Sequence, residues 1–114
     1  MKLRDIVQIV EAEVLCGQDQ LDIEVGAAVA SDLMSDVLTL KCRDFLLITG
    51  LCNVQSIRTA EMSDIHAILY VRDKLVDLEM IALGEDNNMI IMRTPCSMFK
   101  TVGRLYTAGL KPVY

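Results

Sequence analysis

The sequence predicts an α/β fold: a layered, mostly parallel sheet flanked by helices. Two observations predict it. From residue 45 onward, short apolar runs alternate with helical segments, and those apolar runs show no polar alternation. Strands that alternate with helices imply parallel strands joined by right-handed crossovers. An unbroken apolar strand indicates burial on both faces, as in a parallel sheet.

Composition supports a folded, acidic domain. The chain has 114 residues, and we expect one domain over 1–114. Hydrophobic residues make up 53%, which argues against disorder. The net charge is −5 and the basic residues are scattered, so the clustered cations that nucleic-acid binding needs are missing. No apolar run approaches the roughly 20 residues that span a bilayer, and no signal-peptide pattern is present. We expect a cytoplasmic protein that binds neither nucleic acid nor membrane.

The first third of the chain is less regular than the rest. Apolar residues recur at the spacing of one helix face at Leu3, Ile6, Val7 and Val10. Short strands are expected at 14–16 and 25–30. Residues 36–40 form either a strand or the end of a short helix, and a turn follows at 41–44. These strands are expected to join one side of the sheet.

The second part of the chain carries the clearer elements. Buried strands are predicted at 45–49, 66–71 and 89–92. Between them, Asn53 can cap a helix that runs to about Ser63, and Asp77 can cap a helix that runs to about Asp86.

The last helix is predicted to begin at Thr94-Pro95, a capping hydroxyl followed by proline at the first helical position. Its inner stripe is expected to consist of Phe99, Val102 and Tyr106, and Gly109 is expected to end it.

The cysteines are Cys16, Cys42, Cys52 and Cys96. No pair has the Cys-x-x-Cys spacing of a zinc or redox site, so we expect each to behave as a small buried hydrophobe. Cys52 would lie near a helix start, where the pKa of a thiol tends to fall. We expect no cofactor and no metal.

The carboxyl ends of the predicted strands are where a ligand site is expected, because helix N-termini and unpaired backbone N–H groups gather there. Three segments should meet at that edge: 31–34, 49–53 and 93–96. The candidate ligand-binding residues are Ser31, Asp32, Thr49, Gly50, Leu51, Asn53 and Thr94.

Plainer interpretations of the same residues stay open. Thr49-Gly50 could simply turn the chain while Asn53 caps a helix. Asp32 and Asp36 could ligate a divalent cation, or Asp32 could be a turn residue and Asp36 a solvated one. His66, the single histidine, has no partner at a recognisable catalytic spacing and is expected to be structural. No Walker A or Gly-x-Gly-x-x-Gly pattern follows Gly50.

Several stretches resemble the DRTGG-domain family: Val29–Leu38, Leu47–Leu51, Ile57–Met62, Met98-Phe99 and Gly103–Tyr106. The five residues that name the family do not occur here as a string. The resemblance implies a fold similar to the N-terminal domain of HPr kinase/phosphorylase. It also implies an accessory or regulatory role, frequent dimerisation and no active site.

We therefore expect a non-catalytic regulatory or ligand-sensing module that forms homodimers. Its ligand would be a nucleotide or a phosphorylated small molecule at the carboxyl edge of the strands. The alternative is a protein-interaction or scaffold subunit of a redox or hydrogenase-type enzyme system, with an enzyme as its partner. An enzyme would need a nucleophile–base pair or a metal cluster, and the spacings show neither.

Overall fold

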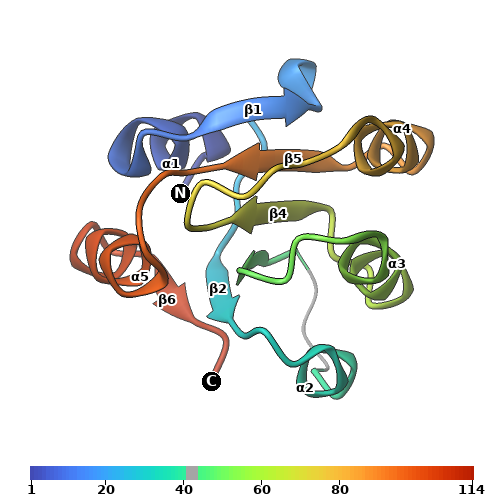
Figure 1. Ribbon diagram of the computed structural model, residues 1–114. Coiled ribbons are helices and arrows are strands. Elements are labelled where there is room, and N and C mark those ends of the chain that lie inside the picture. Colours follow the sequence, from blue (N-terminus) through green and yellow to red (C-terminus); the bar gives the residue numbers. More distant parts are fainter. Residues whose placement is uncertain (41–43) are drawn as a thin grey trace.

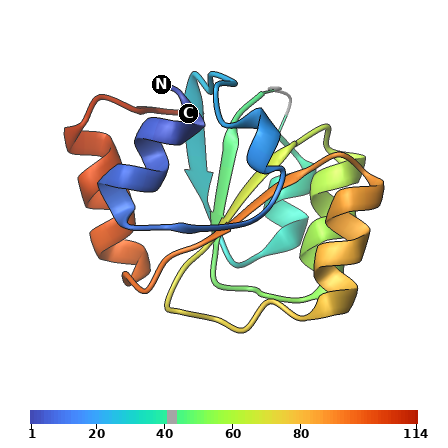
Figure 2. The same ribbon diagram turned by 90° about the horizontal axis from the view of Figure 1, so that it is seen from above.

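A six-stranded sheet lies between two layers of helices in the computed structural model, which describes residues 1–40 and 44–114 (Figure 1 and Figure 2). The strands are β1 (Glu13–Cys16), β2 (Ala27–Ala30), β3 (Leu46–Thr49), β4 (Ala67–Tyr70), β5 (Ile90–Arg93) and β6 (Lys111–Pro112). The helices are α1 (Leu3–Val10), α2 (Met34–Leu38), α3 (Val54–Met62), α4 (Leu78–Asp86) and α5 (Met98–Thr107), with a short 3₁₀ helix at Gln18–Gln20.

The strand order is β1-β5-β4-β3-β2-β6. All neighbours run parallel except β1, which pairs antiparallel with β5. The prediction of a mostly parallel, layered α/β fold is therefore confirmed. The predicted turn at 41–44 falls mainly outside the described residues, as does Cys42.

The sheet separates two aliphatic cores. Helices α2, α3 and α4 cover one face, where Leu47, Ile68 and Ile91 point; α1 and α5 cover the other, above Leu46 and Ile48. Successive side chains of a strand point to opposite faces, so a strand buried on both faces must be apolar at every position. This is why β3 is the clearest strand in the sequence.

Helix α5 corrects two sequence predictions. It begins at Met98, because Ser97 accepts a hydrogen bond from the N–H of Lys100 at 3.1 Å and so caps it. Its inner face carries Thr101 and Leu105, whereas Phe99 is 90% exposed and Tyr106 is 68% exposed. Two overlapping stripes satisfy a period of 3.6 on this helix. The stripe that faces the sheet is the one that contains Thr101 and Leu105, and Leu105 packs in the same core as Leu110.

Two further differences concern sheet edges and short elements. Residues 34–38 form a helix, which resolves the alternative left open for 36–40. Strand β6, which the sequence did not indicate, pairs parallel with Ala27 and Ala28. Two residues cannot display a period, so such a strand has no sequence pattern. Within 1–40 and 44–114, no helix combines the length and apolar character needed to cross a membrane.

Candidate functional site

Strands β2 to β5 run parallel, so their carboxyl ends meet at one edge of the sheet, the lower edge in Figure 2. The loops that leave them, residues 31–33, 50–53, 71–77 and 94–97, form a continuous border that we name the rim. The three segments expected from the sequence all lie on it. The loop 71–77 also belongs to the rim, and sequence reasoning did not include it.

Asp32 joins two rim loops. Its Oδ1 accepts a hydrogen bond from the backbone N–H of Gly50 at 2.6 Å and another from the hydroxyl of Thr49 at 3.2 Å. The same Thr49 hydroxyl oxygen accepts the N–H of Leu51 at 3.1 Å. Ser31 closes a local turn, because its Oγ accepts the N–H of Leu33 at 3.1 Å. The structure thus brings the predicted residues Asp32, Thr49, Gly50 and Leu51 into one hydrogen-bonded cluster, whereas the Ser31 side chain bonds within its own loop.

Arg72 is the residue of this cluster that sequence reasoning missed. Its Nη2 lies 3.9 Å from Oδ2 of Asp32. The tip of its side chain also covers Gly50 so closely that a Cβ on Gly50 would collide with the guanidinium. Arg72 lies two residues after the end of β4, and this position near the carboxyl end of a predicted strand was the available sequence signal. Its φ of +67° and the φ of +54° at Asp73 turn the loop back over the sheet.

Asn53 caps α3 as predicted, since its Oδ1 accepts the N–H of Ser56 at 3.0 Å. Behind it, the Ser56 hydroxyl donates to the carbonyl of Asn53 at 2.7 Å and lies 2.6 Å from the Tyr70 hydroxyl. Because the single Ser56 proton goes to Asn53, Tyr70 is the donor of the second bond. Burial raises the pKa of Tyr70. These buried hydrogen bonds, which we name the buried relay, fix Asn53 to α3 and β4. The half-exposed polar side chains above them are those of Asp32 and Arg72.

Thr94 is the first residue of the rim loop 94–97. It is fully buried; its hydroxyl donates to the carbonyl of Val10 at 2.6 Å and its oxygen accepts the N–H of Cys96 at 3.1 Å. Its carbonyl and that of Cys96 accept the N–H groups of Asp73 and Arg72. Thr94 therefore fixes the loop that carries Arg72 from below.

Cys52 departs from the expectation for a thiol at a helix start. Its Sγ is half-buried and donates to the carbonyl of Leu75 at 3.3 Å. Burial and, next, the negative charge of Asp77 raise the pKa of Cys52. Burial likewise raises the pKa of Cys16. The direction of the shift in the pKa of Cys52 is thus opposite to the one expected for a thiol at a helix start.

One further charged group at this end of the sheet, the guanidinium of Arg93, is already engaged. Arg93 donates to Glu13 at 2.6 Å, and this bond raises the pKa of Arg93. His66 precedes β4 and so lies at the opposite end of the sheet from Asp32. Among the residues described, no three His, Cys, Asp or Glu side chains come close enough to hold a metal ion.

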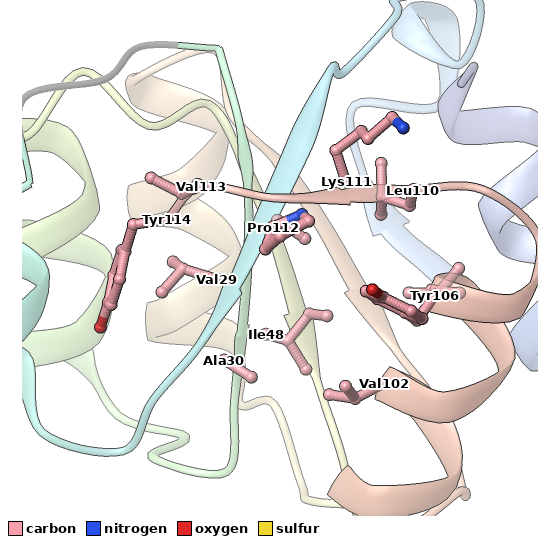
Figure 3. A pocket seen from close by; sticks show the side chains of 12 residues that line it. Val29, Ala30, Ile48, Val102, Tyr106, Leu110, Lys111, Pro112, Val113 and Tyr114 are labelled. Carbon is pink, nitrogen blue, oxygen red and sulfur yellow. The ribbon is translucent and has the colours of Figure 1, made fainter.

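Cavities formed by the described residues also lie away from the Asp32 cluster. One of about 240 Å³ borders the outer edge of β2, under α5 and the last residues of the chain (Figure 3). A second, of about 200 Å³, is bordered by His66 at the other end of the sheet. A third, of about 300 Å³, lies between the 3₁₀ helix and Asn88. Asp32, Thr49 and Gly50 line none of these three.

The fold is similar to that of a solved structure. No protein-family model and no curated protein matches the sequence. The solved structure contains the CBS and DRTGG domains of the regulatory region of Clostridium perfringens pyrophosphatase, in complex with its activator diadenosine tetraphosphate. The TM-score is 0.76 at 17% sequence identity. The match covers 98% of this chain and 48% of that one, so this chain spans about half the length of its structural neighbour. The fold of this chain is thus DRTGG-like.

Proposed function

We propose that this chain is a non-catalytic regulatory module that senses a nucleotide or another phosphorylated small molecule at its rim. The observation that supports this most strongly is the cluster of Asp32, Gly50 and Arg72, drawn from three different loops. The proposed ligand-binding residues are Ser31, Asp32, Thr49, Gly50, Leu51 and Asn53, with Arg72 added. Thr94 would act indirectly, by holding the Arg72 loop.

Asp32 and Arg72 suit different parts of such a ligand: the carboxylate of Asp32 suits a ribose hydroxyl, and the guanidinium of Arg72 suits a phosphate. Oδ1 of Asp32 is occupied by Gly50 and Thr49, whereas Oδ2 faces Arg72 at the longer distance of 3.9 Å. A carboxylate oxygen accepts hydrogen bonds from ribose hydroxyls in dinucleotide-binding folds. A guanidinium binds phosphate through two parallel N–H donors. Both side chains are about half exposed, at 52%, and so are accessible to a ligand.

The comparison supports the ligand class. The solved neighbour belongs to a regulatory region whose activator is a dinucleoside polyphosphate. Its chemistry combines ribose hydroxyls with a phosphate chain, the two groups that Asp32 and Arg72 suit. Diadenosine tetraphosphate is therefore the first ligand to test.

Thermal unfolding with and without ligand tests the proposal. A ligand at one hundred times its dissociation constant should add about 2.7 kcal/mol to the free energy of unfolding. Diadenosine tetraphosphate, ATP, AMP and inorganic polyphosphate should be compared. Arg72→Gln should abolish the stabilisation, and Arg58→Gln, an exposed arginine on α3, should keep it. Absence of stabilisation by all four ligands would exclude the proposed function.

The exposed leucines beside the rim support the proposed homodimer. Leu75 is 80% exposed and Leu78 is 83% exposed, next to Cys52 and Asp77. Contiguous exposed apolar patches mark protein interfaces, and these two leucines lie three residues apart in sequence around the start of α4. Sedimentation velocity should show a dimer that Leu75→Lys with Leu78→Lys dissociates. Met62→Lys, on an equally exposed methionine at the far end of α3, should leave the dimer intact.

The same leucines support the alternative of a scaffold subunit for another enzyme. The two proposals differ in what covers Leu75 and Leu78: a second copy of this chain in the homodimer, or an enzyme partner in the scaffold. A monomer in sedimentation that binds an enzyme partner through Leu75 and Leu78 would favour the scaffold, whereas a stable dimer of the isolated chain favours the homodimeric sensor.

A further inference from the structure

The outer edge of β2 is only partly covered. Strand β6 pairs with Ala27 and Ala28, and the Val113 N–H donates to the carbonyl of Ala28 at 3.1 Å. In a strand, successive residues turn their N–H and C=O groups to opposite edges. The Ser31 N–H donates inward to Ile48 of β3 at 3.0 Å, so both backbone groups of Ala30 face outward. Within 1–40 and 44–114, no residue forms a hydrogen bond with these two groups.

The cavity of about 240 Å³ lies at this edge. Small side chains on β2 leave the space, because Ala28 and Ala30 contribute only methyl groups to its wall. Figure 3 shows Val102 and Tyr106 of α5 directed toward Ile48 and Pro112, so that aliphatic groups and the ring of Tyr106 border the space on this side, while Tyr114 lines its other side. The cavity is thus apolar on its sides and offers one outward backbone donor and one acceptor.

We propose that this cavity binds a nucleobase or a similar flat heterocycle. Adenine, guanine, cytosine and uracil each carry an adjacent hydrogen-bond donor and acceptor, the complement of the Ala30 C=O and N–H. Its faces would pack between Val102, Tyr106 and Pro112, where aromatic and apolar contacts favour flat rings. The site is separate from the rim and does not depend on Asp32 or Arg72.

Size favours a single ring system over an extended peptide. Pockets for drug-sized ligands enclose about 300 to 1,000 Å³, so a smaller cavity suits one base and not a dinucleotide. A peptide that adds a strand needs a run of free edge groups, since strands are usually at least three residues long. Here one residue of edge is free, and Pro112 supplies no N–H to extend it along β6.

Titration of the full-length chain with adenosine, followed by ¹H–¹⁵N correlation spectra, tests the proposal. Adenosine should shift the amide resonance of Ala30 in a saturable manner. Purine riboside, which lacks the exocyclic amine, should bind about tenfold more weakly because the Ala30 carbonyl then has no donor. Tyr106→Ser should weaken adenosine binding about tenfold, and Phe99→Ser should not, since Phe99 is the other exposed aromatic residue on α5.

Several results would overturn the proposal. One is an Ala30 amide resonance that adenosine, guanosine, cytidine and uridine all leave unshifted, and another is a shift caused by a short apolar peptide and by none of these nucleosides. Equal adenosine affinity of Tyr106→Ser, with dispersed spectra that show it folded, would also exclude the site. Arg72→Gln should bind adenosine as the natural chain does, which separates this test from that of the rim.

Discussion

The Oδ1 oxygen of Asp32 lies 2.6 Å from the backbone nitrogen of Gly50, eighteen residues further along the chain. The bond links the loop after β2 to the loop after β3. It places the carboxylate of Asp32 against the loop that leads into the N-terminus of α3. A backbone N–H at such a position is where an external anion binds in many α/β proteins. In this chain a side chain already occupies it.

Asp32→Ala should therefore lower the free energy of unfolding by about 1 to 2 kcal/mol, because the Gly50 N–H and the Thr49 hydroxyl lose their acceptor. Asp32→Asn retains the oxygen and should cost less than about 1 kcal/mol. Urea unfolding, with an unchanged dependence on denaturant, measures both. Equal losses for the two variants would show that the charge, and not the acceptor, is what matters.

Glycine positions 50 and 17 should respond differently to alanine. A Cβ at Gly50 meets the flexible tip of Arg72, which can move, so Gly50→Ala should cost less than about 1 kcal/mol. A Cβ at Gly17 meets the Met89 carbonyl oxygen at 2.8 Å and the Ile90 Cα at 2.9 Å, and its φ is +81°. Gly17→Ala should cost about 2 to 3 kcal/mol. Thermal unfolding of the pair provides the comparison, and the reverse order would contradict it.

The buried relay of Tyr70 and Ser56 should also respond asymmetrically. Ser56→Ala leaves the buried Tyr70 hydroxyl without an acceptor and should cost about 2 kcal/mol. Tyr70→Phe leaves Ser56 bonded to the carbonyl of Asn53, so it should cost about 1 kcal/mol or less. Chemical denaturation decides between them. A larger loss for Tyr70→Phe would mean that the Ser56 proton points to Tyr70 instead.

Cys52 should react slowly with alkylating reagents near neutral pH. Its pKa is raised by burial, and the thiolate is the reactive form, so the folded chain holds less thiolate than an ordinary thiol at the same pH. The rate at Cys52, followed by mass spectrometry of its peptide, should rise with pH and should still be rising beyond the ordinary value of 9.0, where the rate of an unperturbed thiol begins to level off. The urea-unfolded chain is the reference and should react faster at pH 8. Equal rates would show that Cys52 is not protected.

Acidification should weaken one surface contact. The hydrogen bond from Arg4 lowers the pKa of Asp22, so the folded state binds that proton less readily than the unfolded state. The contribution of the contact is present above the ordinary value of 3.8 and is lost as the pH falls through the lowered pKa. Asp22→Asn should remove this pH dependence with little change in stability near pH 7, because the pair is exposed. Unfolding curves between pH 2 and pH 7 would show a steeper loss for the natural chain.

The sequence predicted those elements of the fold that depend on residues only a few positions apart. The apolar run of β3 and the caps Asn53 and Asp77 each satisfy their requirements within a few residues, and the structure confirms them. The contact of Arg72 with Asp32 depends on two consecutive left-handed residues, which the sequence Arg72-Asp73 does not announce. The inner face of α5 depended on packing, since its exposed aromatic residues suit a helix stripe equally well.

The position of β1 has a consequence for how the molecule assembles. Its partner β5 is separated from it by more than seventy residues, and the Thr94 hydroxyl reaches back to Val10 across a similar span. Strand β6, almost the last segment, completes the opposite border. Contacts this distant in sequence slow folding because a long loop must close before they form. During synthesis, strands β2 to β4 can join early, while the apolar face of α1 stays partly uncovered until α5, which shares its core, has been synthesised.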